Sequence, residues 1–171
     1  SNQVLKLIRI LLEEGLDVRK GVEEIFLLLG EFGLEKLYEA LLEESNPNSR
    51  KLLIELLIRF GPKSIERLRG ILKDPAKPAH LQMLAIEAIG RTKNPEDATL
   101  IKPFLRHSRP ELRAEAISAL VRIMGQDSVP ALETLSSDSD PMVKKRWLAA
   151  IGFLAKGNPF LRARIAQVAF N

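Results

Sequence analysis

The stretch that decides the fold runs from Pro110 to Leu135 and reads PELRAEAISALVRIMGQDSVPALETL. Before Gly125, apolar residues recur at intervals of three and four, which places them on one face of a helix. Gly125 suits the left-handed conformation that ends many helices. A second apolar series begins at Val129, and Pro130 is tolerated in the first turn of a helix. The stretch therefore predicts two helices joined by a short turn.

The same pattern recurs along the chain with a period close to 31 residues. Prolines mark it at intervals of 31, 32 and 31, namely Pro47, Pro78, Pro110 and Pro141. A polar residue a few positions later repeats with the same period, namely Arg19, Arg50, Gln82, Arg113 and Lys144. Glycines close the apolar runs, namely Gly30, Gly61, Gly90, Gly125 and Gly152. Three series in phase indicate a structural repeat.

This periodicity predicts an all-α fold, an α-solenoid of about five antiparallel helix pairs, because a single pair cannot bury its apolar face alone. The pairs are expected near residues 17–44, 48–74, 79–107, 111–136 and 142–170, after a lone helix at 4–14. We expect a single domain over residues 1–171, with repeats near 17–47, 48–78, 79–110, 111–141 and 142–171. The opening Ser1-Asn2 is typical of a cleaved tag, so we interpret the chain as a domain excised from a longer protein.

The repeat resembles HEAT repeats, particularly the short HEAT-like repeats of the phycobilisome lyase type. The resemblance is strongest at Pro110–Leu120, followed by Gly125 and Val129–Leu132, and next strongest from Asp140 to Gly152. It implies a stack in which the second helix of each pair lines a concave face. The family includes scaffolds, adaptors, chromophore-lyase subunits and a DNA-repair branch, so the resemblance alone does not decide the function.

The composition excludes several classes of protein. The chain is 46% hydrophobic and 28% charged, as expected of a folded globular domain. Without cysteine it has neither disulfides nor thiolate metal sites. It contains no apolar run long enough to span a membrane, and a net charge of +4 does not demand a nucleic-acid partner. We expect a cytoplasmic protein without a membrane partner.

Catalytic signals are scarce. The chain lacks a nucleophile elbow, a phosphate-binding glycine loop and a dinucleotide fingerprint. His80 and His107 lie about one repeat apart near turns, too few ligands for a metal site. Adjacent acids such as Glu13 and Glu14 point about 100° apart on a helix and do not share a proton. We therefore predict no catalytic residue, no cofactor, no metal and no enzymatic activity.

The basic series at the helix starts has two interpretations. A basic residue in each repeat forms a row that could hold phosphates. Alternatively, the row bonds carbonyls and acids of neighbouring repeats, such as Asp17 and Asp140. Because these residues lie close to helix starts and turns, we favour the structural interpretation.

Charge is segregated by repeat. Segments 1–47, 48–78, 79–110, 111–141 and 142–171 carry net charges of −5, +5, +2, −4 and +6. This alternation either attracts successive repeats to one another or forms a bipolar binding surface. If the apolar residues of the second helices face the core, cations of two successive second helices face away from it, namely Lys63, Arg67, Lys102 and Arg106. We predict that these four residues bind a partner.

The sequence thus favours a non-enzymatic scaffold or adaptor that binds a partner segment along its concave face. The expected partner is another protein or another domain of the same chain, with an acidic segment as one option. The alternative is binding of a nucleic-acid backbone through a basic groove, as in helical-repeat DNA-repair proteins. The low net charge and a single tryptophan argue against this alternative. A lyase-type enzyme subunit is a third hypothesis, and no nucleophile or acid–base pair supports it.

Overall fold

The structure is a computed structural model that describes Lys6, Ile10 and residues 16–169. Throughout these residues the regular secondary structure is helical and no strand occurs, which confirms the all-α prediction. Apart from Lys6 and Ile10, the lone helix predicted at residues 4–14 lies outside the described residues.

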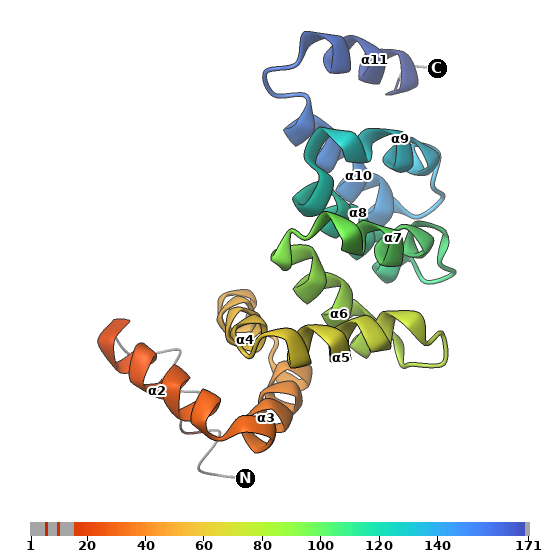
Figure 1. The fold of residues 1–171 in the computed structure, drawn as a ribbon. Helices are drawn as coiled ribbons and strands as arrows, with labels where there is room; N and C mark the ends of the chain where they lie inside the picture. Colours follow the sequence, from red (N-terminus) through yellow and green to blue (C-terminus); the bar gives the residue numbers. More distant parts are fainter. Residues whose placement is uncertain (1–5, 7–9, 11–15, 170–171) are drawn as a thin grey trace. The chain divides into compact units, whose positions relative to one another are not determined.

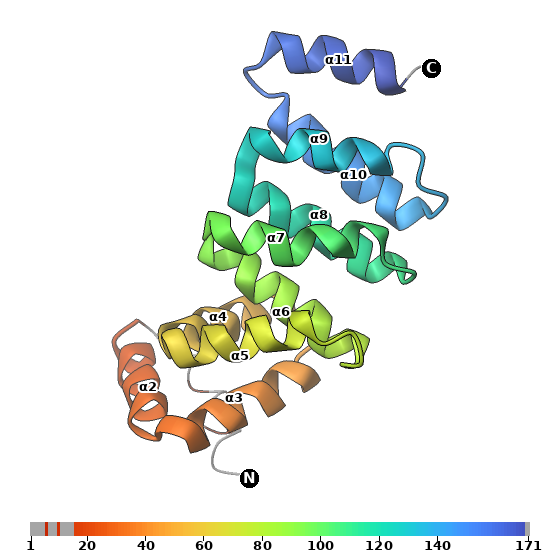
Figure 2. The same ribbon diagram turned by 45° about the vertical axis from the view of Figure 1, so that its right-hand side comes forward.

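Helices follow one another in pairs at the predicted repeats (Figures 1 and 2). The first two pairs are α2 (Leu16–Leu28) with α3 (Gly30–Glu43), and α4 (Pro47–Arg59) with α5 (Pro62–Lys73). The third is α6 (Ala79–Thr92) with η1 (Pro95–Asp97), α7 (Ala98–Ile101) and η2 (Lys102–Arg106). The fourth is α8 (Pro110–Met124) with η3 (Gly125–Ser128), α9 (Val129–Leu132) and η4 (Glu133–Leu135), and the last is α10 (Pro141–Leu154) with α11 (Pro159–Ala169).

The second members of the third and fourth pairs differ from the continuous helices that the sequence predicts. In both, a single α-helical turn is flanked by 3₁₀ turns. Pro103 and Pro130 lie within these segments. Proline has no backbone N–H to donate, and its ring clashes with the preceding turn, so a regular α-helical ladder cannot run through it. The result is a shorter, irregular second helix in each of these repeats.

Contacts divide the chain into two compact units, residues 1–68 and 69–171, and the boundary falls within α5. In the first unit α3 packs against both α2 and α4. Its core consists of fully buried apolar side chains, among them Phe26, Leu34, Leu37, Leu41, Leu53 and Leu57. The prediction of a single domain over residues 1–171 stays a prediction.

In the second unit α8 is the central helix. It packs against α6 on one side and α10 on the other, and it also contacts α7 and η2 (Figure 1). Side chains from these helices form a continuous apolar core, among them Leu84, Ile86, Leu112, Ile117, Leu120 and Trp147. The buried indole N–H of Trp147 is also hydrogen-bonded, because Nε1 donates to the Leu132 carbonyl at 2.8 Å.

The prolines that repeat every 31 or 32 residues lie at the start of a helix or directly before it. The Asn46 side chain accepts hydrogen bonds from the Asn48 and Ser49 amides at the start of α4. Asp140 does the same for the first amides of α10. A proline then occupies the first helical position, where a missing N–H has no cost. The recurring polar-residue–proline pair is therefore a helix-start signal.

The glycine series has two different structural origins. Gly30, Gly61 and Gly125 have positive φ values of 54°, 78° and 55°, which glycine adopts without steric cost. Gly90 instead lies inside α6, which ends at Lys93 with a φ of 57°. A Cβ atom on Gly90 would lie 2.7 Å from Ala119 Cβ. Gly90 and Gly152 thus close apolar runs but lie inside α6 and α10, so neither ends its helix. At Gly90 the absent side chain instead allows α6 and α8 to approach closely.

We expect Gly90→Ala to lower the free energy of unfolding by roughly 1–3 kcal/mol, because the added methyl group must force α6 and α8 apart. Urea denaturation followed by circular dichroism measures this change. Gly152→Ala is the matched control, because a Cβ atom on Gly152 of α10 meets nothing within 4 Å. This control should leave stability unchanged or raise it by up to about 1 kcal/mol. Equal stability of the two variants would contradict the close contact.

Candidate partner-binding surface

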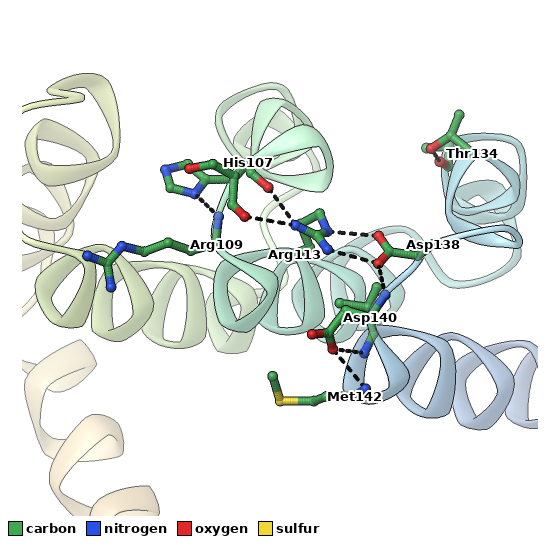
Figure 3. Close-up of polar contacts among 10 residues, drawn as sticks. His107, Arg109, Arg113, Thr134, Asp138, Asp140 and Met142 are labelled. Atoms are coloured by element: carbon green, nitrogen blue, oxygen red, sulfur yellow. Dashed lines mark hydrogen bonds and ion pairs between the residues drawn. The ribbon is translucent and has the colours of Figure 1, made fainter.

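Arg113 joins two successive repeat turns of the second unit (Figure 3). Its Nε and Nη2 atoms each donate to a carboxylate oxygen of Asp138 at 2.8 Å. Its Nη1 atom donates to the carbonyls of His107 and Ser108 at 2.9 and 3.1 Å. A planar guanidinium with several donors can make such a bidentate pair and bond a turn at the same time. The turn before α8 is thereby tied to the turn before α10.

Two other members of the same series have comparable contacts. Arg50 Nη1 donates to the Leu41 carbonyl at 2.9 Å, and Gln82 Nε2 donates to the Asp74 carbonyl at 3.4 Å. The structural interpretation of the series is therefore confirmed at these positions and at Arg113. The side chain of Arg19 lies outside the described residues, and Lys144 is exposed.

The acidic residue that pairs with Arg113 is not the one that the sequence predicted. Arg113 pairs with Asp138, whereas Asp140 accepts from the amides of Met142 and Val143 at 2.8 and 3.2 Å (Figure 3). Asp138 also accepts from the Asp140 amide at 2.9 Å. The prediction that Asp140 bonds the basic series is thus wrong, because its position directly before Pro141 commits it to capping α10.

The Arg113–Asp138 pair shifts the titration of both groups. The hydrogen bonds from Arg113 lower the pKa of the Asp138 carboxyl below its ordinary value of 3.8, and Asp138 raises the pKa of Arg113. Because the folded-state pKa of Asp138 is depressed, its contribution to stability is present above pH 3.8 and is lost as the pH falls through the folded-state pKa.

We expect Asp138→Asn to lower the free energy of unfolding at pH 7 by roughly 1–3 kcal/mol, because Arg113 loses its charged acceptor. The difference from the unsubstituted protein should shrink as the pH falls below about 3.8. Chemical denaturation between pH 2.5 and 7 measures both effects, with Asp127→Asn, at an exposed carboxylate, as control. A difference that stays constant down to the lowest pH would exclude this linkage.

Two of the four predicted partner-binding cations, Lys63 and Arg67, lie in the first unit and already have acidic partners. Lys63 forms an ion pair with Glu31 of α3. Arg67 donates to both carboxylate oxygens of Glu35, and its guanidinium lies 4.3 Å from the centroid of the Tyr38 ring. The hydrogen bond from Arg67 lowers the pKa of Glu35. These two cations are therefore partly neutralised from within the unit.

The other two cations, Lys102 and Arg106, lie in the second unit, and both are exposed on η2. Among the residues that the structure describes, neither has an ion pair. They line a hollow of about 500 Å³ together with Thr99, Pro103, Leu105, Ala131 and Thr134. No carboxylate lines this hollow. The structure thus brings Lys102 and Arg106 together at one site, while Lys63 and Arg67 belong to the other unit.

A second hollow, of about 380 Å³, lies on the same segment and was not anticipated from the sequence. Its apolar walls include Leu72, Leu100 and Phe104, and its lining also includes Lys73 and His107. The ring of His107 stacks on Phe104 with a centroid distance of 5.9 Å, and its Nδ1 atom accepts from the Arg109 amide.

Neither metal nor membrane chemistry is evident in the part of the chain that the structure describes. No group of three or more His, Cys, Asp or Glu side chains there is placed to hold a metal ion. Likewise, none of the helices described is both long and apolar enough to cross a bilayer. His80 is exposed, whereas His107 stacks on Phe104 and accepts a hydrogen bond from the Arg109 amide.

Comparison with known proteins supports the repeat assignment. The family described as HEAT repeats matches residues 34–111. A curated relative, the bilin biosynthesis protein RpcE of Synechococcus sp. (strain WH8020), is 30% identical over 93 residues. The alignment covers 54% of this chain and 35% of the relative, so the matched part spans about a third of that protein.

A solved structure has a fold similar to that of this chain. The complex of CpcE and CpcF of phycocyanin lyase from Nostoc sp. PCC7120 contains a chain that matches with a TM-score of 0.51 and 18% identity. That match covers 86% of this chain and 96% of the other. An engineered protein matches with a TM-score of 0.44 and 16% identity over 99% of this chain and 95% of its own. The predicted likeness to HEAT-like repeats of the phycobilisome lyase type is confirmed.

Proposed function

We propose that this chain is a binding module, not itself an enzyme, that holds a partner protein against the hollow lined by Lys102 and Arg106. The partner is a separate protein or another domain of the same chain. One observation carries the proposal: two exposed cations without an ion pair in the described residues share a hollow of about 500 Å³ that no carboxylate lines. The setting we propose for this module is the cytoplasm.

The electrostatics favour an acidic partner. Two neighbouring cations repel each other, and a carboxylate placed between them relieves that repulsion. Lys63 and Arg67 are included in the proposed partner-binding set, but they differ from the first two. Because Glu31 and Glu35 already contact them, an incoming carboxylate must compete with these acids. We expect Lys63 and Arg67 to contribute less to affinity than Lys102 and Arg106.

The comparisons support a protein partner. The neighbour with the TM-score of 0.51 comes from a complex of two chains, CpcE and CpcF. HEAT-like helix pairs present long surfaces on which another chain can lie. By this analogy we propose that the chain works as one component of an assembly.

A capture experiment tests the proposal. The chain, its Lys102→Glu/Arg106→Glu variant and the control Lys156→Glu are immobilised and exposed to an extract of the cells that make the protein. Lys156 is an exposed cation that lies outside both hollows. A protein retained by the chain and by the control is purified, and its dissociation constants are measured by calorimetry. We expect the double variant to bind roughly 100-fold more weakly, about tenfold for each lost contact. Equal affinity for all three proteins, each folded by circular dichroism, would contradict the proposal.

The same three proteins also distinguish binding of a partner protein from the alternative, binding of a nucleic acid. Fluorescence anisotropy with a labelled DNA duplex is measured at low and at physiological salt. Our proposal predicts weak binding in both conditions. Tight binding that weakens steeply with salt would instead support a phosphate-binding function, since counterion release produces that dependence.

The name of the curated relative favours a second candidate, a component of a lyase that acts on bilins. Both hollows have volumes within the range of small-molecule sites. Addition of a bilin to the chain, followed by visible absorption, tests this candidate directly. A spectral shift that is lost in the Lys102→Glu/Arg106→Glu variant would favour it, and an unchanged spectrum would count against it.

A further inference from the structure

The two hollows of the second unit flank one ridge of the chain. Thr99 and Pro103 line both of them. Lys102 and Arg106 line only the larger hollow, whereas Leu100 and Phe104 line only the smaller. Residues on α7 and η2 therefore line two hollows that share Thr99 and Pro103, and the larger of the two carries both Lys102 and Arg106.

The smaller hollow is suited to an apolar side chain. Leu72, Leu100 and Phe104 supply its walls, and Phe104 is itself 7% exposed, so its ring is fixed in the wall. His107 stacks on Phe104 and holds it further. A pre-formed apolar hollow beside polar groups is the arrangement in which a single large side chain contributes most to an interface.

The charged side chains that line the two hollows are all basic. Lys73 lines the apolar hollow, and Lys102 and Arg106 line the other. None of the side chains lining either hollow is an aspartate or a glutamate. A bound segment that carries carboxylates on either side of its apolar residue would therefore meet a cation at each side.

We propose that the ridge recognises an acidic segment that carries one large apolar side chain. The apolar side chain enters the hollow beside Phe104, and the carboxylates lie against Lys102, Arg106 and Lys73. This inference rests on the proposed function and names the chemistry of the partner segment. A nucleic acid fits less well, because Phe104 is buried and offers no exposed ring on which a base can stack.

Defined peptides test this inference without knowledge of the natural partner. A fluorescein-labelled peptide with four glutamates, one phenylalanine and four further glutamates is compared with two variants. In one variant glycine replaces the phenylalanine, and in the other glutamine replaces every glutamate. Anisotropy titration at 50 mM salt gives the affinities. We expect each variant to bind at least tenfold more weakly than the parent peptide.

Protein variants locate the two contacts. Leu100→Ser should weaken binding of the phenylalanine peptide at least fivefold and leave the glycine peptide unchanged. Lys102→Glu and Lys73→Glu change exposed residues and should weaken every glutamate peptide, whereas Lys156→Glu should not. If Leu100→Ser fails to fold, Lys73→Glu still tests contact at the apolar hollow, because Lys73 lines that hollow and not the larger one.

The outcomes separate this inference from the proposed function. Equal binding of the phenylalanine and glycine peptides would overturn the apolar contact. Failure of all peptides, together with capture of a partner that needs Lys102 and Arg106, would overturn the inference and leave the proposed function intact. Tight, salt-sensitive binding of the DNA duplex in place of the peptides would overturn both.

Discussion

The close approach of α6 and α8 is the constraint on which the second unit depends. It is possible because Gly90 has no side chain where Ala119 contacts it. Packing at this distance places Leu112, Ile117 and Leu120 of α8 in a core that excludes water completely. The short second helices then lie against α8, since α7 and η2 both contact it. The two hollows open beside these short helices.

Two contrasting groups of charged residues occur in this chain. In the first group each arginine has a carboxylate partner in bidentate geometry, as in Arg113 with Asp138 and Arg69 with Asp97. Asp97 is 2% exposed, so its ion pair with Arg69 belongs to the folded core of the second unit. The second group consists of exposed cations such as Lys102 and Arg106. Only the second group can exchange water for a partner's carboxylate without breaking an internal contact.

The irregular second helices are what give the proposed site its form. A continuous α-helix through Pro103 would place side chains at regular spacing along one cylinder. The 3₁₀ turns instead change the direction in which successive residues point, so that Thr99 and Pro103 form a ridge between two hollows. Lys102 and Arg106 lie exposed on η2, on either side of this proline. The 3₁₀ turns around Pro103 thus contribute to the form of the proposed binding site.

The sequence by itself determined the class of fold and the limits of the helix pairs. The periods of proline, polar residue and glycine depend on local chemistry, because capping, a proline at the first helical position and a left-handed turn each involve only a few neighbouring residues. This is why the starts of α4, α8 and α10 were predictable to within a residue. The structural role of Arg113 was also predictable, since it lies one turn after a helix start.

Only the tertiary structure decided how the residues are used. Gly90 and Gly125 look alike in the sequence, yet one permits helix contact and the other a left-handed turn, because the difference depends on what lies opposite. Lys63 and Lys102 likewise both lie in second helices and were both predicted to face away from the core. Glu31 approaches the first, whereas no carboxylate lines the hollow at the second. Such contacts join residues about 30 positions apart, and a sequence period gives their spacing along the chain without giving the partner that folding brings to each side chain.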